Sequence, residues 1–538
     1  MFKHTILVAA VAGLVLALAG TAQANTLYWD TNDTAAGFGN TLGTWGTDNW
    51  WNQDSTGGSG SGGFIAVPTA STDVLYLNYG DLSPFTMSVS GNVYAKQIVL
   101  STAKLTTTIN NGGSGVIHLY FAGEAITGAS GDTTLNINVP IVLEQTAGST
   151  VKLSSSSGNN SSGSITGKIS STNSVNLILN RGGGESYGAI DIKGTLATSV
   201  NNVSKSKTIT ISGNIGSGVT DVTHNATNNA GYVTTLLLQG NNTYIGKTTV
   251  TRGVIKAGST TAFGTNSPVT LANTTDVALN LAGFNNSIGS LTGGGATGGN
   301  VTLGAATLTV GGDGTSPAAY AGVISSTGSP VTSLIKIGGG TQTLSGNNTY
   351  TGNTTISNGT LALTGTGAIA NSPTIDVALG AIFDVSTVTG GYTLGASQTL
   401  KGKGTVTGPM TVAGTLSPGA SIGTITVTGN ATLSGTFSVD VETDGTSDLL
   451  AVTGTGSDLT LGGALFVVDT LKLKWPYYTI ATYTGKLYGS FASTNLGTTT
   501  YSVDTTSTPG SVLLVPEPAT LALLGLGGLG VILGRKRR

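Results

Sequence analysis

The sequence predicts an all-β protein whose body is a long β-solenoid, and three observations lead to this expectation. Glycine accounts for 84 of 538 residues, charged residues for 9% and hydrophobic residues for 38%. Short runs alternate apolar and hydroxyl residues, and one turn-and-strand unit occurs twice. Usual contents are about 7% glycine and about 25% charged residues, so a charged helical domain is excluded. An ordinary disordered tail is excluded as well, because disorder goes with low hydrophobicity and high net charge.

The alternating runs predict strands with one buried face. Phe437, Val439 and Val441 alternate with polar residues, and Ile425 and Val427 alternate with threonines. A period of two over four to eight residues is typical of such strands. Gly-Asn, Gly-Gly and Asn-Gly pairs separate them, and these residues tolerate the positive φ that sharp turns need. We find no convincing amphipathic helix in the body.

The repeated unit favours a solenoid over a closed barrel. Residues 240–244 and 346–350 both read Gly-Asn-Asn-Thr-Tyr, each preceded by a Leu and followed by a Gly and a Thr-Thr pair. A solenoid adds such units indefinitely, because each rung contacts only its neighbours. Apolar residues are then expected inside, Thr and Ser outside, and Gly or Asn at the corners.

Residues 344–363, LSGNNTYTGNTTISNGTLAL, resemble the autotransporter-associated β-strand repeat. The resemblance extends from about Thr235 to about Phe491. It implies a right-handed parallel β-helix exposed at a bacterial surface. The sequence departs from the autotransporter pattern because no translocator barrel follows the passenger-like region. The chain is therefore not expected to export itself.

The first 24 residues predict a cleaved secretory signal peptide. Lys3 and His4 precede an apolar run over residues 6–19, and Ala22-Gln23-Ala24 ends the segment. A basic stretch, a short apolar run and a small-x-small site in this order define such a peptide. Ala22 and Ala24 are the small residues of the site, and cleavage is expected after Ala24. Cysteine is absent, so neither disulfides nor thiolate metal sites hold the exported chain together.

The last 24 residues predict a single transmembrane helix. Pro516-Glu517-Pro518 leads into an apolar run over residues 519–534. At about 1.5 Å per residue the helix is about 24 Å long, barely enough to cross hydrocarbon. The basic tail keeps its end in the cytoplasm and the body outside the inner membrane; it consists of Arg535, Lys536, Arg537 and Arg538. These features alone fit a permanent membrane anchor as well as a temporary one.

The string VPEPATLALLGLGGLGVILGRKRR resembles the PEP-CTERM sorting signal. The resemblance implies that Pro516, Glu517 and Pro518 are recognised by an exosortase-type membrane transpeptidase, which removes the tail. The protein would then be anchored transiently in the inner membrane and end at the cell surface or in the extracellular matrix.

These signals divide the chain into five expected segments. Residues 161–500 are the solenoid with its repeats, residues 501–514 a linker and residues 515–538 the sorting signal, behind the signal peptide 1–24. Residues 25–160 are expected to form a β-rich capping region. It contains four of the five tryptophans, Trp29, Trp45, Trp50 and Trp51. They predict a cap or first small core, and the alternative is that exposed Trp residues stack on sugar rings.

We expect no catalytic, cofactor or metal site. His118 and His224, the two histidines of the mature body, are interpreted as surface or turn residues. Residues 440–445, DVETDG, match the opening of an EF-hand loop, but Ala451 stands where a bidentate Glu is required, so the strand-end interpretation is simpler. A formal net charge of −2 over the whole chain gives no reason to expect nucleic-acid binding.

The leading functional prediction is a non-enzymatic surface or matrix protein that acts by length and repetition, with an adhesion-like role. The alternative is a β-helix protein that binds or cleaves extracellular polysaccharide. Cleavage would need clustered acids with a basic residue on one strand face. Arg181 and Arg252 are the arginines of the body, and neither lies in an evident cluster.

Overall fold

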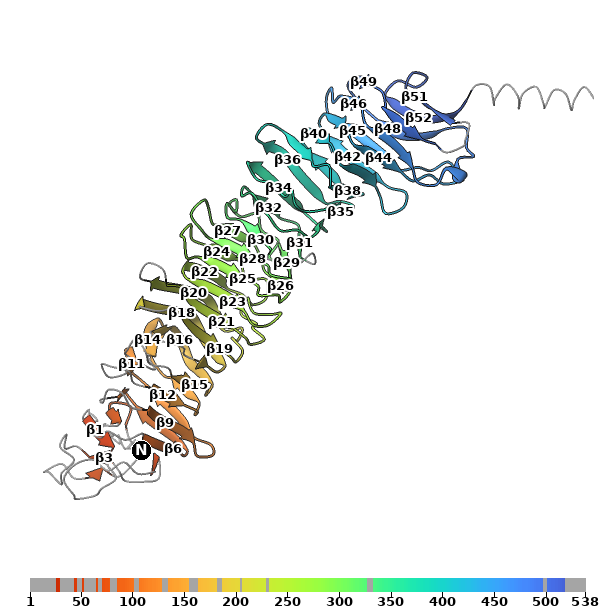
Figure 1. Cartoon of the computed structure of the whole chain (residues 1–538). Coiled ribbons are helices and arrows are strands. Elements are labelled where there is room, and N and C mark those ends of the chain that lie inside the picture. Colours follow the sequence, from red (N-terminus) through yellow and green to blue (C-terminus); the bar gives the residue numbers. More distant parts are fainter. Residues whose placement is uncertain are drawn as a thin grey trace, which may run out of the picture.

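The protein is an elongated stack of short β-strands (Figure 1) in a computed structural model. The structure describes residues 26–517 except 30–42, 46–50, 53–63, 66–69, 78–84, 101–105, 128–133, 154–162, 181–185, 204–205, 229–231, 327–331 and 497–500. Within these residues the secondary structure consists of strands, turns and one 3-10 turn, η1 (Thr470–Lys472). The prediction of an all-β protein is confirmed.

Five sheets run along the stack. The first has 16 strands, namely β1 (Thr26–Trp29), β3 (Trp51–Asn52), β4 (Phe64–Ile65), β5 (Val74–Leu77), β7 (Asn92–Ala95), β8 (Gln97–Leu100), β10 (Val116–Leu119), β11 (Gly123–Thr127), β13 (Ile141–Leu143), β14 (Ser149–Leu153), β16 (Ile169–Asn180), β18 (Ile190–Val203), β20 (Val219–Asn228), β22 (Lys247–Arg252), β24 (Val269–Leu271) and β27 (Leu291–Gly293). The second has 12 strands, namely β2 (Gly43–Trp45), β6 (Phe85–Val89), β9 (Thr106–Asn111), β12 (Thr134–Ile137), β15 (Ser164–Ile165), β17 (Ser186–Tyr187), β19 (Lys207–Ile211), β21 (Thr234–Leu238), β23 (Val254–Ala257), β25 (Ala278–Asn280), β28 (Asn300–Thr302) and β30 (Ile324–Ser325).

The C-terminal half contains the other three. The 10-stranded sheet contains β26 (Asn286–Ser287), β29 (Thr307–Val310), β31 (Ser333–Lys336), β33 (Thr354–Ile356), β35 (Thr374–Val377), β38 (Thr399–Gly402), β41 (Thr415–Pro418), β44 (Thr436–Val439), β47 (Ala464–Val467) and β50 (Ser493–Asn495). The 9-stranded sheet contains β32 (Thr341–Leu344), β34 (Thr360–Gly365), β36 (Ile382–Val388), β39 (Thr405–Thr407), β42 (Thr424–Thr428), β45 (Leu449–Thr453), β48 (Tyr478–Thr482), β51 (Tyr501–Asp504) and β52 (Ser511–Pro516). The 5-stranded sheet contains β37 (Tyr392–Leu394), β40 (Met410–Val412), β43 (Ala431–Leu433), β46 (Leu459–Leu461) and β49 (Leu487–Gly489).

Successive rungs pair in parallel and nearly in register. Thr248 of β22 faces Val269 of β24, which in turn faces Leu291 of β27. Most strands therefore pair with the strand about one turn later in sequence, as a parallel solenoid requires. The exceptions among the described strands are the antiparallel pairs at the two ends, β1–β3–β4 and β48–β52–β51. The solenoid prediction is confirmed, and the right-handed coil that the resemblance implies stays a prediction.

The core fills the interior of the stack because the strands alternate buried and less buried residues. In β42 the side chains of Ile425 and Val427 are buried while the threonines beside them are not, and in β44 Phe437 and Val439 are buried in the same way. The expected inward Val, Ile and Leu and outward Thr are thus found.

Residues 501–516 contain two strands, whereas a linker was expected over residues 501–514. β51 and β52 form an antiparallel pair, and β52 also pairs antiparallel with β48. Val512 and Leu514 are buried against the core. Without this hairpin β48 would be the open edge of the 9-stranded sheet, and bare sheet edges attract other chains. Parallel pairing also crosses the expected boundary at residue 160, since β14 pairs with β16.

Candidate functional site

The chain leaves the folded body at the predicted sorting motif. β52 ends at Pro516, which faces Tyr501 of β51 across the hairpin. Glu517 follows directly, and its side chain is exposed. The first two residues of the motif therefore lie at the end of the last strand, where a second protein can reach them.

The other predicted sorting residues lie outside the described part of the chain: Ala22, Ala24, Pro518, Arg535, Lys536, Arg537 and Arg538. The apolar run 519–534 lies outside it too. Among the described residues, no helix has the length and apolar character that crossing a membrane needs.

The repeated unit is a buried corner that joins three rungs. Asn242 accepts a hydrogen bond from the Ile215 N–H of the preceding rung at 2.8 Å. Its amide donates to the Ala262 carbonyl of the following rung at 2.7 Å. Asn348 makes the equivalent two bonds, at 2.9 and 3.0 Å. The asparagines expected at corners are found at both copies, where they bond to backbone groups of the neighbouring rungs.

A buried tyrosine fixes the strand that follows each corner. The Tyr244 hydroxyl lies 2.9 Å from Thr248 Oγ1, which lies 2.8 Å from Ser267 Oγ. The second copy repeats this contact between Tyr350 and Thr354 at 2.6 Å. Burial raises the pKa of both tyrosines above the usual value. The hydroxyls therefore stay protonated and act as structural donors or acceptors.

The glycine after each tyrosine permits close contact between rungs. A Cβ added to Gly246 would lie 1.1 Å from the Thr220 carbonyl oxygen, and one added to Gly352 would lie 1.0 Å from that of Thr332. Any side chain at these two positions would push the rungs apart, which explains why the sequence pattern includes them.

The two copies lie at different corners. The first lies between β21 and β22, and the second lies between β32 and β33. β22 and β32 belong to the same ladder of the solenoid. β22 pairs with β24 and β24 with β27, and Tyr320 then bridges Gly293 of β27 to Leu344 of β32. The first copy thus precedes a strand of this ladder while the second follows one. The unit is a local device that fits more than one corner.

The interpretation of the histidines is wrong for His224. Its side chain is fully buried in β20, 2.7 Å from Thr198 Oγ1 and 3.2 Å from the Thr234 carbonyl oxygen. Because that carbonyl can only accept, Nε2 carries the proton. Burial lowers the pKa of His224 to about 4. The ring is a neutral core group that joins neighbouring strands.

His118 is a partly buried strand residue. Its Nδ1 lies 2.8 Å from Glu144 Oε1, and its ring stacks on Tyr94 with centroids 4.9 Å apart. This arrangement places a histidine, a carboxylate and an aromatic ring along β7, β10 and the end of β13. No nucleophile is among these contacts.

The acidic segment 440–448 is a tight turn. Val441 is buried and bridges to Ser447, and Asp448 accepts hydrogen bonds from the N–H groups of Gly423 and Asp440 at 2.8 and 3.0 Å. Burial raises the pKa of Asp448 to about 6. Within the described residues, no group of three His, Cys, Asp or Glu side chains is placed to hold a metal ion.

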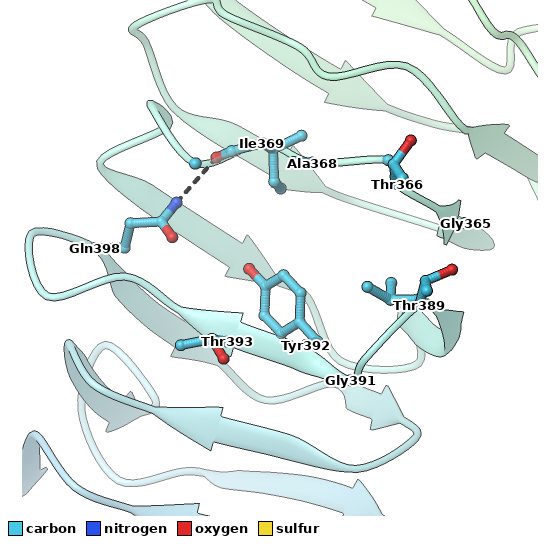
Figure 2. Close-up of a pocket in the computed structure, with 12 residues that line it drawn as sticks. Gly365, Thr366, Ala368, Ile369, Thr389, Gly391, Tyr392, Thr393 and Gln398 are labelled. Carbon is cyan, nitrogen blue, oxygen red and sulfur yellow. Dashed lines mark hydrogen bonds between the residues drawn. The ribbon is translucent and has the colours of Figure 1, made fainter.

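A cavity of about 220 Å³ opens beside Tyr392 (Figure 2). Gln398 is buried there and donates to the carbonyls of Ile369 and Ser372 at 2.9 and 2.7 Å. The Tyr392 hydroxyl is buried and has no hydrogen-bond partner among the described residues. No Asp, Glu, His, Lys or Arg lines the cavity, and burial raises the pKa of the Tyr392 hydroxyl.

One tryptophan of the expected cap is settled. Trp45 is fully buried in β2, so it cannot stack on a sugar. Trp29 in β1 and Trp51 in β3 are described in their backbone alone, and Trp50 lies outside the described residues.

Comparisons with known proteins match the repeats in the middle of the chain and its C-terminal motif. The passenger-associated-transport-repeat family matches residues 234–257 and 334–363, which contain the two corner units. The PEP-CTERM protein-sorting motif matches residues 514–538. The chain carries autotransporter-type repeats and a PEP-CTERM sorting motif. Both resemblances predicted from the sequence are thereby confirmed.

A curated relative is similar to part of the chain. The chain is 36% identical over 194 residues to "Adhesin BmaC autotransporter" of Brucella suis biovar 1 (strain 1330). The match covers 32% of this chain and 6% of the relative. The similarity therefore concerns a minor part of a much longer protein.

Proposed function

We propose that this protein is an exported, non-enzymatic rod displayed at the bacterial surface or in the matrix, with an adhesin-like role. The observation that carries the proposal is the junction at Pro516 and Glu517, where the Pro-Glu-Pro sequence of a sorting motif begins at the last residue of β52. The repeats and the similarity to part of an adhesin autotransporter support a passenger-like body. A right-handed coil belongs to the same proposal.

In this scheme residues 1–24 direct export and are removed after Ala24. Residues 519–534 then hold the chain in the inner membrane, with the basic tail in the cytoplasm. An exosortase-type transpeptidase recognises Pro516, Glu517 and Pro518 and releases the body. Antiparallel pairing of β52 suits this step, because the body stays folded while the sequence after Pro516 is processed.

Replacing Pro516, Glu517 and Pro518 together by alanine tests the sorting step. An internal tag in the full chain, mass spectrometry and cell fractionation follow the product. We expect the native chain to lose its tail and the variant to stay full length in the inner membrane. The matched control replaces Ser507, Thr508 and Pro509, exposed residues of the β51–β52 turn, and should be processed normally. Equal processing of all three chains would contradict the role of the motif.

The alternative, a polysaccharide-cleaving enzyme, would need acids clustered with a basic residue, and it predicts new chain ends in an incubation with polysaccharide. Arg252 lies 3.8 Å from Asp276, and Arg181 lies outside the described residues. We infer that the body binds partners, extracellular polysaccharide among them, without cleaving them. Incubation of the purified protein with a panel of polysaccharides should yield no new chain ends. Their appearance would refute the non-enzymatic proposal.

A further inference from the structure

We propose that the connection between β47 and β48, residues 468–477, is a docking loop for the membrane interface. Four of its side chains are large, apolar or aromatic and exposed: Val468, Leu471 (81%), Trp475 (46%) and Tyr477 (55%). The inference rests on the proposed membrane insertion of residues 519–534. The loop lies in the blue end of the rod in Figure 1, between β47 and β48.

The loop is an ordered element with a fixed shape. The buried hydroxyl of Tyr478 accepts hydrogen bonds from the N–H groups of Lys474 and Trp475, at 3.0 and 3.2 Å. The same hydroxyl donates to the Lys472 carbonyl at 2.9 Å. Leu473 is buried beneath them. The backbone of the loop is therefore fixed to the body, which holds its neighbouring apolar side chains outward.

Trp475 is held half-exposed by a turn of the preceding rung. A Cβ added to Gly445 would lie 2.7 Å from Trp475 Cδ1, so the ring lies against this glycine. Lys472 donates to Glu442 Oε1 of the same turn at 2.7 Å. The contact with Gly445 thus covers part of the indole, and the Lys472–Glu442 bond ties the loop to the same turn.

The loop lies beside the point where the chain leaves the body. The Tyr501 hydroxyl donates to the Trp475 carbonyl, and Tyr501 faces Pro516 across the β51–β52 hairpin. Only Pro518 separates Glu517 from the apolar run at Ala519. A residue spans at most about 3.6 Å, so the exit lies within about 7 Å of the start of that run.

This short connection brings the end of the rod to the lipid surface. Headgroup layers add about 10 to 15 Å in total to a hydrocarbon core of about 30 Å, or about 5 to 8 Å on each side. When residues 519–534 occupy the hydrocarbon, the exit and its neighbouring loop must lie in or against the headgroups. Trp and Tyr favour this layer, because one part of the ring is apolar and the other is polar.

The charges around the loop favour insertion of apolar groups over attraction to anionic lipid. Lys472 and Lys474 are accompanied by Asp469 in the loop and by Asp440, Glu442 and Asp444 in the neighbouring turn. The surface is not basic overall. A zwitterionic phospholipid interface is therefore the occupant that fits, and the contact should withstand salt.

Trp475 provides a direct test, because the other four tryptophans lie at positions 29 to 51. The full chain is reconstituted into phosphatidylcholine vesicles with or without bromine on the upper acyl chain. The difference in emission between the native chain and Trp475→Phe isolates this residue. We expect bromine to lower the isolated emission at least about twofold, as for an indole at the interface, and to leave the N-terminal emission unchanged. Leu471→Ser with Tyr477→Ser should reduce the quenching.

The control is Leu379→Ser, since Leu379 is as exposed as Leu471 (82%) but follows β35 in an earlier rung. It should leave the quenching intact.

Flotation with the vesicles separates the proposed membrane insertion of the tail from the proposed docking loop. If the chain does not float, membrane insertion of the tail is refuted and the docking loop with it. If the chain floats but Trp475 emission is unchanged by bromine, the loop proposal alone is overturned. A response of Trp475 to soluble polysaccharide and not to bromine would likewise overturn it.

Discussion

Neighbouring asparagines in one corner have opposite environments, and this contrast predicts opposite effects of mutation. Asn347 is exposed, whereas Asn348 is 1% exposed and binds the Ile324 N–H and the Ala368 carbonyl. Asn348→Ala leaves the Ile324 N–H unpaired, which costs about 1 to 3 kcal/mol. It also removes one of the two hydrogen bonds to the Ala368 carbonyl, and the backbone N–H of residue 348 keeps the other at 2.9 Å. Hydrogen exchange should therefore accelerate in β30 and in residues 366–370. Asn347→Ala is the matched control and should change little; equal effects would contradict the corner assignment.

A buried histidine predicts a local response to pH. His224 is neutral in the folded rod because burial lowers its pKa from 6.5 to about 4. The unfolded state therefore binds more protons between these values, so stability is full above about pH 6.5 and falls as pH falls toward 4. The total loss is about 3 kcal/mol. Exchange protection of β20, corrected for intrinsic rates, should decline over this range.

His224→Gln should remove this decline, and His118→Gln should keep it, because His118 lies partly exposed in another rung. Asp448 gives the opposite sign. Burial raises its pKa from 3.8 to about 6, so its contribution is full below 3.8 and is lost as pH rises through 6. Acid should thus weaken β20 while favouring the turn at 440–448. A uniform response along the rod would refute both assignments.

His224 also shows what the sequence could have revealed. Val222, His224 and Ala226 are buried at alternate positions of β20, so the period of two already places the ring inside. The alternation rule used for β42 and β44 would have found it. By contrast, the partners of Asn348 and of Trp475 lie on other rungs or turns. Sequence spacing alone does not say which rung follows which, so those contacts needed the structure.

At the scale of elements, the β51–β52 hairpin acts as the cap of the 9-stranded sheet. Leu514 is fully buried and faces Tyr478 of β48, while Val515 is half-buried. Leu514→Asp puts a charge into the core, so the hairpin should detach and expose the edge of β48. We expect concentration-dependent association in light scattering after size-exclusion chromatography. Val515→Asp is the control and should remain like the native chain.

The hairpin was missed from the sequence for a physical reason. Residues 501–504, Tyr-Ser-Val-Asp, carry a weak pattern because all four are only partly buried at the end of the stack, so no alternation of buried and exposed positions marks the strand. The corners, the strand alternation and the sorting motif could be predicted, since each is local in sequence. The end cap and the docking loop could not, since each depends on which rung is last.

At the scale of the molecule, one ladder of the rod is thin where the two halves meet, while the 10-stranded sheet continues through this region from β29 to β31 and β33. Between β27 and β32 the ladder is reduced to the two bridges of Tyr320. Gln342 reaches across this rung from β32: its amide donates to the Leu291 carbonyl at 2.8 Å, and its Oε1 accepts from the Leu291 N–H at 3.0 Å. One side chain, 51 residues away in sequence, replaces the missing strand.

This junction predicts how the rod unfolds. Rungs contact only their neighbours, so cooperativity between the halves depends on each interface. Gln342→Ala leaves two buried backbone groups unpaired, which weakens this interface by about 1 to 3 kcal/mol.

The four N-terminal tryptophans and Trp475 report on opposite ends, and Trp475→Phe separates their signals. In urea we expect the two signals to have distinct midpoints in Gln342→Ala and closer midpoints in the native chain. Gln239→Ala, at an exposed position after β21, should match the native chain. Unchanged midpoints in Gln342→Ala would show that the sheets on the other faces carry the coupling.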